Sequence, residues 1–309
     1  MSVAVKVDGL VKNYGTKKAV VNAVKAVSFD VQQSELFGII GPDGAGKTSL
    51  FRMLTTLLLP DGGSATVDGS DIVKDFKAIR NKVGYMPGRF SLYQDLTVEE
   101  NMNFFATIFN TSIEENYDLV KDIYVQIEPF KKRKAGKLSG GMKQKLALSC
   151  ALIHRPTVLF LDEPTTGVDA VSRKEFWEML KSLQKQGITI MVSTPYMDEA
   201  NLCDRIAFIQ TGKILSVDTP QNIIKNFSKK LFAVKGKDMY KILLKLRDFS
   251  EVETSYAFGD YHHITLKKDE ATENDIKNYL NAELPGEEVT VKMIEPGIED
   301  SFMEYLNKS

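Results

Sequence analysis

The fold of this chain is decided by the stretch Gly41-Pro42-Asp43-Gly44-Ala45-Gly46-Lys47-Thr48, which matches the pattern G-x-x-x-x-G-K-[ST]. The run before it, Glu35–Ile40 (ELFGII), is almost wholly apolar and predicts a buried strand. The run after it, Thr48–Leu59, has the apolar spacing of a helix. A glycine-rich loop between a strand and a helix is the setting that makes such a match a P-loop, with a chance glycine-rich turn as the alternative.

The residue types of this loop suit a phosphate group. Glycines let successive backbone N–H groups point at one place, and the helix N-terminus adds partial positive charge there. The Lys47 ammonium can reach the β- and γ-phosphates of a nucleotide, and the Thr48 hydroxyl can bind Mg²⁺. The sequence thus predicts a site for ATP with Mg²⁺. The expected binding residues of the loop are Gly41, Asp43, Gly44, Ala45, Gly46, Lys47, Thr48 and Ser49.

A second motif supplies two carboxylates. The stretch Val158-Leu159-Phe160-Leu161-Asp162-Glu163 consists of four apolar residues followed by two acids. A buried strand would deliver Asp162 to the phosphate end of the sheet, where it can hold Mg²⁺. Glu163 lies one residue further, where it can orient and polarise an attacking water, so we expect Glu163 and Lys47 to be the catalytic residues. An apolar strand that ends in Asp-Glu is common, so by itself it is weak evidence for a nucleotide site. Because this one follows a P-loop in the sequence, it becomes strong evidence.

A third motif, Leu138-Ser139-Gly140-Gly141-Met142-Lys143-Gln144-Lys145, opens a predicted helix. Ser139 at the helix start, followed by Gly140 and Gly141, makes a second N-terminus that suits an anion. Because the P-loop already cradles the phosphates of its own nucleotide, this second site suggests a nucleotide held by another copy of such a domain. The motif alone could arise by chance, whereas its place between a P-loop and a strand ending in Asp-Glu argues against chance.

These three motifs, in this order over about residues 3–220, resemble the nucleotide-binding domain of ABC transporters. In that family two domains pair head to tail with two ATP molecules between them. The resemblance implies that Ser139 and Gly141 contact the γ-phosphate of a nucleotide on the partner's P-loop, with Gly140 as a further binding residue of the same loop. It also implies that Tyr14 stacks on adenine, the alternative being a tyrosine of an ordinary surface turn. Residues 167–169 (Gly-Val-Asp) would cross the seam between the two domains.

The residues in and around the motifs are most similar to those of the subunits of ABC-2-type exporters. It includes Asp43 of the P-loop, residues 90–93 (FSLY), residues 196–200 (YMDEA) and residues 296–302 (PGIEDSF). The resemblance implies two kinds of partner, namely transmembrane permease subunits and a second nucleotide-binding subunit. Residues 89–93 would form part of the groove that receives a permease helix. The alternative is that this loop packs on its own helical subdomain.

Two positions depart from the family pattern. Gly88 stands where the family has a glutamine that touches Mg²⁺ and the attacking water, and Pro195 stands where it has a histidine that holds the γ-phosphate. The three histidines, His154, His262 and His263, lie elsewhere in the sequence. We therefore expect the chain's own ATP site to be slow and its partner cassette to be non-identical. The alternative is an ATP-binding clamp that does not hydrolyse.

The expected fold class is α/β, a P-loop NTPase cassette of ABC type followed by a small α+β ferredoxin-like domain. Near-continuous apolar runs predict a largely parallel core sheet, and alternating residues near the N-terminus predict antiparallel strands. The predicted domains are residues 1–220, with a helical subdomain at about 89–155, and residues 221–309. In the second domain the predicted order β-α-β-β-α-β is that of a ferredoxin-like unit. We expect this tail to be a structural or regulatory appendage, because it lacks a glycine-rich loop and a cluster of catalytic residue types.

Composition narrows the class of protein. The 309 residues fit two domains, and 40 basic residues against 41 acidic ones argue against a nucleic-acid partner. A soluble ABC protein acting on ribosomes or DNA remains the less favoured reading, since the chain has one cassette and no long heptad run. The N-terminus lacks a signal-peptide pattern, and apolar runs are far shorter than the ~20 residues of a membrane helix. We expect a cytoplasmic protein held at the inner face of the membrane by its permease, with Cys150 and Cys203 as core thiols.

Overall fold

The computed structural model describes residues 2–16, 19–267 and 272–308. These residues form two compact units, Met1–Pro220 and Gln221–Ser309, and each unit has its own apolar core. Helix α7 (Pro220–Lys225) begins at the boundary between the units.

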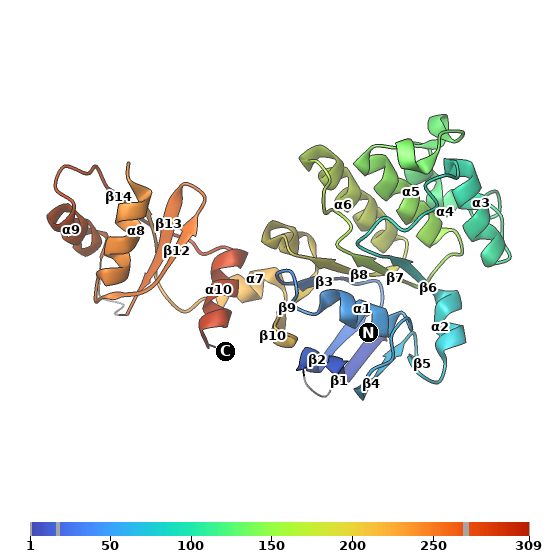
Figure 1. Ribbon diagram of the computed structural model, residues 1–309, viewed down its shortest axis with the longest axis horizontal. Coiled ribbons are helices and arrows are strands. Elements are labelled where there is room, and N and C mark those ends of the chain that lie inside the picture. The colour runs from blue at the N-terminus through green and yellow to red at the C-terminus, as the bar shows by residue number, and fades with distance from the viewer. Residues whose placement is uncertain (1, 17–18, 268–271, 309) are drawn as a thin grey trace. The chain divides into compact units, whose positions relative to one another are not determined.

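The larger unit is built on a six-stranded sheet of order β10-β9-β3-β8-β7-β6 (Figure 1). Its strands are parallel except β10, which is antiparallel to β9. Every residue of β3, β7 and β8 is buried, as expected for a sheet covered on both faces. The α/β fold predicted from the sequence is confirmed. The strands are β3 (Leu36–Ile40), β6 (Val83–Met86), β7 (Val158–Asp162), β8 (Thr189–Thr194), β9 (Arg205–Gln210) and β10 (Lys213–Asp218).

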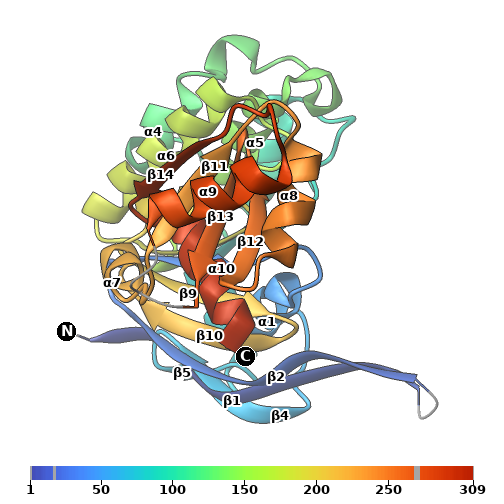
Figure 2. The same cartoon turned by 90° about the vertical axis from the view of Figure 1, so that its left-hand side faces the viewer.

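An antiparallel sheet lies beside this core, with β1 and β2 forming a long hairpin that Figure 2 shows from the side. Its order is β2-β1-β4-β5, for β1 (Val3–Thr16), β2 (Ala19–Gln32), β4 (Gly62–Val67) and β5 (Ser70–Asp71). Helix α1 (Lys47–Leu54) packs between the two sheets, and its Leu50 and Phe51 share one core with residues of both.

Helix α1 spans Lys47–Leu54, so the prediction of a helix as far as Leu59 was wrong at its end. The Thr55 hydroxyl donates to the Phe51 carbonyl at 2.8 Å, and Thr56 has a φ of 62°. A β-branched residue with positive φ cannot continue a right-handed helix, which explains why the apolar run ends as a turn.

Helices α3 to α6 cover the other face of the six-stranded sheet (Figure 1). Both cysteines are free and buried, as predicted: Cys150 lies in α5, and Cys203 lies between β8 and β9. Burial raises the pKa of both thiols. The helices of this unit before α7 are α2 (Phe76–Lys82), α3 (Val98–Ile108), α4 (Tyr117–Tyr124), α5 (Gly140–Leu152) and α6 (Ala170–Lys185), with short turns η1 (Glu128–Phe130), η2 (Ala135–Lys137) and η3 (Met197–Leu202).

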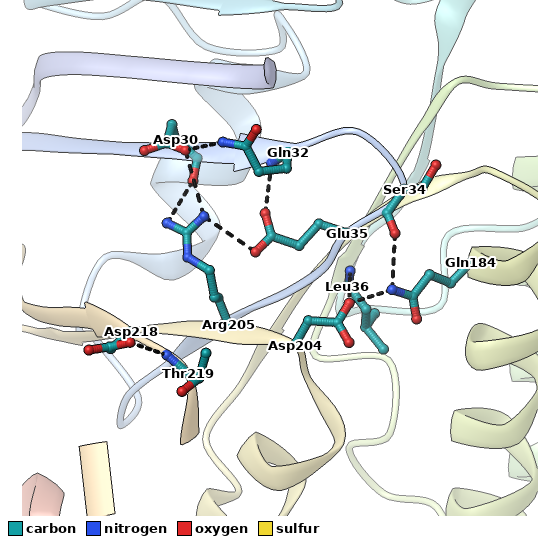
Figure 3. Close-up of polar contacts among 10 residues, drawn as sticks. All are labelled: Asp30, Gln32, Ser34, Glu35, Leu36, Gln184, Asp204, Arg205, Asp218 and Thr219. Carbon is teal, nitrogen blue, oxygen red and sulfur yellow. Dashed lines mark hydrogen bonds and ion pairs between the residues drawn. The ribbon is translucent and has the colours of Figure 1, made fainter. Parts of the chain in front are cut away.

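A polar network joins the two sheets at the start of β3 (Figure 3). Glu35 is 7% exposed, accepts the Gln32 N–H at 2.6 Å and lies 3.4 Å from the Arg205 guanidinium. Arg205 also lies 3.6 Å from the carboxylate of Asp30 on β2. Burial raises the pKa of Glu35, while the Gln32 N–H and Arg205 oppose that rise. Because the P-loop follows the other end of β3, this network supports the sheets rather than the site.

The smaller unit has the β-α-β-β-α-β order expected from the sequence, and its sheet order is β12-β13-β11-β14. Helices α8 and α9 share one apolar core with the sheet. Helix α10 is tied to the sheet by a 2.7 Å contact between His263 Nδ1 and Asp300 Oδ1. The elements are β11 (Leu231–Lys235), α8 (Met239–Asp248), β12 (Val252–Phe258), β13 (Tyr261–Leu266), α9 (Glu273–Glu283), β14 (Thr290–Ile294) and α10 (Ile298–Lys308).

Candidate functional site

The P-loop leaves the carboxyl end of β3 and turns directly into α1. Gly44 and Gly46 have φ values of 76° and 105°, which only glycine adopts without strain. At Gly41 a Cβ would lie 2.1 Å from the carbonyl oxygen of Ile209, so the backbone passes too close to β9 for any side chain. The loop predicted from the sequence therefore has a conformation that requires its glycines.

The N-terminus of α1 is open toward the loop. Its N-cap is Gly46, which has no side chain to accept the first N–H groups, and the first turn carries Thr48 and Ser49. The Tyr14 hydroxyl lies 3.1 Å from Ser49 Oγ, so β1 brings this aromatic ring beside the helix start. Tyr14 is 40% exposed, as a platform for a flat ligand would be.

Lys47 lies at the centre of the site. Its Nζ donates to the carbonyls of Gly41 at 2.8 Å and Pro42 at 3.0 Å, and it lies 3.1 Å from Glu163 Oε1. The lysine is only 3% exposed. The parallel sheet thus brings together the two residues expected to be catalytic, which are far apart in the sequence.

The two carboxylates at the end of β7 are held by β8. Ser193 Oγ donates to Asp162 Oδ1 at 2.5 Å, and the Glu163 N–H donates to the Ser193 carbonyl at 3.0 Å. Glu163 has a φ of 50°, so the chain turns sharply at this residue. None of the sequence motifs includes Ser193. The signal that indicates it is the register of the parallel pair β7–β8, in which Ser193 lies opposite Asp162.

Both departures from the family pattern lie next to segments that form the site. A Cβ at Gly88 would be 3.0 Å from the Asp162 carbonyl oxygen and 3.7 Å from Glu163 Cβ. Pro195 follows Thr194, whose carbonyl accepts the Gly41 N–H of the P-loop at 3.2 Å. Position 88 therefore lies beside the backbone of Asp162 and the Cβ of Glu163, and position 195 directly follows a residue that contacts the P-loop.

The motif at residues 138–145 is not brought onto the P-loop. It begins α5, on the face of the six-stranded sheet opposite α1 (Figure 1). Ser139 Oγ caps this helix by accepting the Met142 N–H at 3.3 Å. A Cβ at Gly141 would lie 2.7 Å from Ser172 Oγ, which shows how closely α5 meets the start of α6. Asp169 caps α6 through the N–H groups of residues 171 and 172.

A groove of about 470 Å³ runs between β6, α3 and α5. Gly88, Phe90 and Ile108 are among its lining residues. Tyr93 is instead packed edge-on against Phe104 of α3, with ring centroids 4.8 Å apart. Of the two aromatic residues in the 89–93 loop, only Phe90 therefore lines the groove.

The geometry fits a magnesium nucleotide. The open helix N-terminus and the Lys47 ammonium suit phosphates, and the Asp162 carboxylate and Thr48 hydroxyl are hard oxygen donors of the kind that Mg²⁺ prefers. Asp162 is 2% exposed, and Ser193 donates to its Oδ1, which leaves Oδ2 as the oxygen that can serve a cation among the residues the structure describes.

Comparison with known proteins identifies the family. Residues 24–166 match the family model described as "ABC transporter". The Nod factor export ATP-binding protein I of Burkholderia lata is 40% identical over 218 residues, which cover 70% of this chain and 70% of that protein. The chain belongs to the ABC transporter ATP-binding proteins. This family hydrolyses ATP, and its ATP-binding subunits work with transmembrane permease subunits.

A longer relative matches almost the whole of this chain. The probable multidrug ABC transporter ATP-binding protein YbhF of Escherichia coli (strain K12) is 38% identical over 288 residues. The match covers 92% of this chain but 49% of YbhF, so the chain spans about half the length of that relative.

Solved structures share the fold of the cassette. A dimeric post-hydrolysis state of the cassette MJ0796, bound to ADP and phosphate, is 26% identical with a TM-score of 0.63 and covers 70% of this chain and 98% of that one. The cbiO1 protein of Clostridium perfringens, part of the cbiONQ transporter complex, is 25% identical with a TM-score of 0.64 and covers 80% and 97%. Within the described ranges of this cassette, no helix has the length and apolar character needed to cross a bilayer.

Proposed function

We propose that this chain binds MgATP and powers an ABC-2-type exporter, paired with a second, non-identical cassette. It would act at the cytoplasmic face of the membrane through permease subunits. The observation that carries the proposal is the 3.1 Å approach of Lys47 and Glu163 in a site whose positions 88 and 195 are glycine and proline. The names of the relatives, a multidrug transporter protein and a Nod factor export protein, support the direction of transport.

The roles of the residues follow from their positions. The N–H groups of residues 44–49 and the Lys47 ammonium bind the β- and γ-phosphates, and Tyr14 stacks on the adenine ring. Thr48 and Asp162 hold Mg²⁺, which when bound neutralises phosphate charge. Glu163 orients the attacking water. Ser193 fixes the Asp162 carboxylate through its 2.5 Å hydrogen bond.

The partner cassette completes each site in this proposal. Ser139, Gly140 and Gly141 lie on the opposite side of the sheet from the chain's own P-loop, so they serve a nucleotide bound by the second cassette. That second cassette carries the glutamine and histidine that this chain lacks. The intact motif at residues 138–145 thereby assists hydrolysis in the partner's site.

The chain's own site acts as a slow clamp. Loss of one well-placed transition-state donor typically costs about 10²–10³ in rate. Gly88 and Pro195 lack two such donors, and the proposal is supported by the place of Gly88 beside the Asp162 backbone and of Pro195 after Thr194, which contacts Gly41. Two copies of this chain would carry the loss in both sites, which favours a non-identical partner.

Docking to the permease uses the groove between β6, α3 and α5. The apolar side chains of Phe90 and Ile108 line it, and Ile108 is 54% exposed. An exposed apolar groove of this kind suits an amphipathic helix of a partner. Tyr93 lies outside the groove lining, with its ring packed edge-on against Phe104 of α3 and 51% of the residue exposed, so a docked helix could still contact it.

Turnover by the purified chain tests the proposal. We expect MgATP to bind, as measured by calorimetry, and steady-state hydrolysis to stay far below the median enzyme rate of about 10 s⁻¹. Adding a cassette with intact glutamine and histidine should produce fast hydrolysis that depends on Ser139. Hydrolysis at several turnovers per second by this chain alone would show that the two substitutions are compensated and would refute the asymmetric pair.

A second candidate is a clamp that never hydrolyses. Gly88 and Pro195 favour it, and the presence of Glu163 beside Lys47 argues against it. Single-turnover hydrolysis by the wild type and by Glu163→Gln separates the two candidates. A wild-type rate equal to that of the variant identifies the non-hydrolysing clamp.

A further inference from the structure

One buried carboxylate, that of Glu199, forms hydrogen bonds with two segments of the proposed site. Glu199, in η3, is 1% exposed. Thr165 Oγ1 donates to its Oε1 at 2.7 Å, and Thr194 Oγ1 donates to its Oε2 at 2.5 Å. The two oxygens of one side chain thus bind the hydroxyls of two segments that are distant in the sequence.

Each threonine anchors a loop of the nucleotide site. Thr165 belongs to the loop 163–169, and its carbonyl accepts the N–H of Val168 at 3.3 Å. Thr194 ends β8, and its carbonyl accepts the N–H of Gly41 in the P-loop at 3.2 Å. The carboxylate therefore connects the loop that carries the catalytic glutamate with the strand end that contacts the P-loop.

The two threonine hydroxyls are closer to the Glu199 carboxylate than the Arg173 guanidinium is. Arg173 Nε lies 3.8 Å from Glu199 Oε1, which is too long for a hydrogen bond. The Arg173 guanidinium stacks on the Tyr196 ring at 4.5 Å and lies 3.5 Å from Asp198. A buried carboxylate with so long an ion pair needs its hydrogen-bond donors, so removing either side of the contact disturbs both loops.

We propose that Glu199 is a positioning residue, which sets the loop 163–169 and the end of β8 before a nucleotide binds. In the family pattern a histidine at position 195 holds the γ-phosphate, so bound nucleotide can steady this segment. Pro195 has no side-chain donor and no backbone N–H, so here the segment is held from the side of Glu199. The proposal rests on the proposed function where it concerns MgATP.

Hydrogen–deuterium exchange of peptides covering residues 163–169 and 194–200 tests this assignment. In the wild type these amides should exchange slowly, and MgATP should change their rates little. In Glu199→Ala they should exchange at least about tenfold faster without nucleotide, as for loss of hydrogen bonds to a charged acceptor. MgATP should then slow them again, because the nucleotide now has to order loops that were loose.

Three variants separate positioning from general damage. Asp198→Ala removes the neighbouring carboxylate, whose side chain is 74% exposed, and should behave as wild type. Glu199→Gln keeps an acceptor oxygen of the same reach and should restore much of the protection. Thr165→Val removes one hydroxyl from a side chain of equal shape, and it should speed exchange in 163–169 even if Glu199→Ala fails to fold.

Two results overturn the proposal. One is wild-type exchange in both Glu199→Ala and Thr165→Val. The other is a wild-type response of the two loops to MgATP as large as that of the variants. If calorimetry shows that the wild type binds no MgATP, the proposed function fails, whereas the nucleotide-free comparison of the variants still decides the role of Glu199.

Discussion

Nζ of Lys47 lies 3.1 Å from Oε1 of Glu163, and it also donates to two carbonyls of the P-loop. The lysine comes from the first residue of α1 and the glutamate from the residue after β7, with β8 between the two parent strands. The positive charge expected to meet phosphates is thus balanced by the residue expected to act on water. We infer that nucleotide binding replaces Glu163 by a phosphate as the partner of Lys47.

Lys47→Ala should weaken MgATP binding severely while the chain stays folded. Loss of hydrogen bonds from a charged donor costs about 1.5–3 kcal/mol, so the dissociation constant measured by calorimetry should rise about 10- to 100-fold or more. The free energy of unfolding should fall by about 1–3 kcal/mol, because the carbonyls of Gly41 and Pro42 lose their donor and the bond to Gly41 is buried.

A matched lysine variant controls for loss of charge. Lys82 forms a 2.8 Å ion pair with Asp68 on the surface, away from the P-loop residues, and is 44% exposed. Lys82→Ala should bind MgATP as the wild type does, since exposed pairs contribute little. Equal affinity of Lys47→Ala and the wild type would remove the basis for the P-loop assignment.

Restoring the two missing side chains should raise turnover. Pro195→His with Gly88→Gln returns two donors to the site, and each is worth about 10²–10³ in rate when well placed. The gain at position 88 should be smaller than this, because a Cβ there would lie 3.0 Å from the Asp162 carbonyl oxygen. Single-turnover hydrolysis should therefore rise more with Pro195→His than with Gly88→Gln.

Gly88→Ala controls for the fit of the backbone. It adds the Cβ without the amide, so any loss of MgATP affinity in this variant measures the displacement of the β7 end. If the double variant hydrolyses no faster than the wild type while Gly88→Ala binds normally, the slow site has a cause other than these two substitutions.

The sequence predicted elements with strong local patterns better than those without. The strand predicted over Glu35–Ile40 is observed as β3 (Leu36–Ile40), because its continuous apolar run and the glycine-rich loop after it are local features of the sequence. Strand β4 (Gly62–Val67) was missed, since its residues GGSATV are small and partly exposed. Helix α4 (Tyr117–Tyr124) was missed because its eight residues make a short pattern with mixed polarity.

The same distinction applies to the site. Motifs of consecutive residues indicated Lys47, Asp162 and Glu163, which the sheet does bring together. Ser193 and Glu199 were not predicted as site residues, because their partners lie on other strands and loops. Contacts of this kind depend on the register of a parallel sheet, which local periodicity does not determine.

The Glu35 carboxylate should make the chain less stable as the pH rises. Burial raises its pKa above 4.5, so around and above this pH the folded chain holds more protons than the unfolded chain. The free energy of unfolding therefore falls as the pH increases through the raised pKa. In the Glu35→Gln variant the free energy of unfolding should therefore fall less between pH 4.5 and pH 7 than in the wild type, as measured by urea unfolding at the two pH values.

A carboxylate with the opposite shift provides the control. The Arg155 guanidinium, 2.5 Å from Asp118, lowers the pKa of this exposed carboxyl, so its contribution appears as the pH rises. Asp118→Asn should change the pH dependence slightly in the other direction. A decline with pH that is identical in Glu35→Gln and the wild type would show that the Arg205 contact fully offsets burial.

Two adjacent glycines at the start of α5 should respond oppositely to alanine. At Gly141 a Cβ would lie 2.7 Å from Ser172 Oγ and 3.0 Å from Ser172 Cβ, so Gly141→Ala has to push α5 away from α6. Overpacking of this kind costs about 1–3 kcal/mol.

At Gly140 the first contact is the Gly167 carbonyl oxygen at 3.5 Å, which is ordinary packing, and alanine favours a helix over glycine by up to about 1 kcal/mol. Urea unfolding should therefore show Gly141→Ala destabilised and Gly140→Ala unchanged or more stable. Equal stability of the two variants would mean that Ser172 turns away at no cost, and that the close meeting of α5 and α6 does not require glycine at position 141.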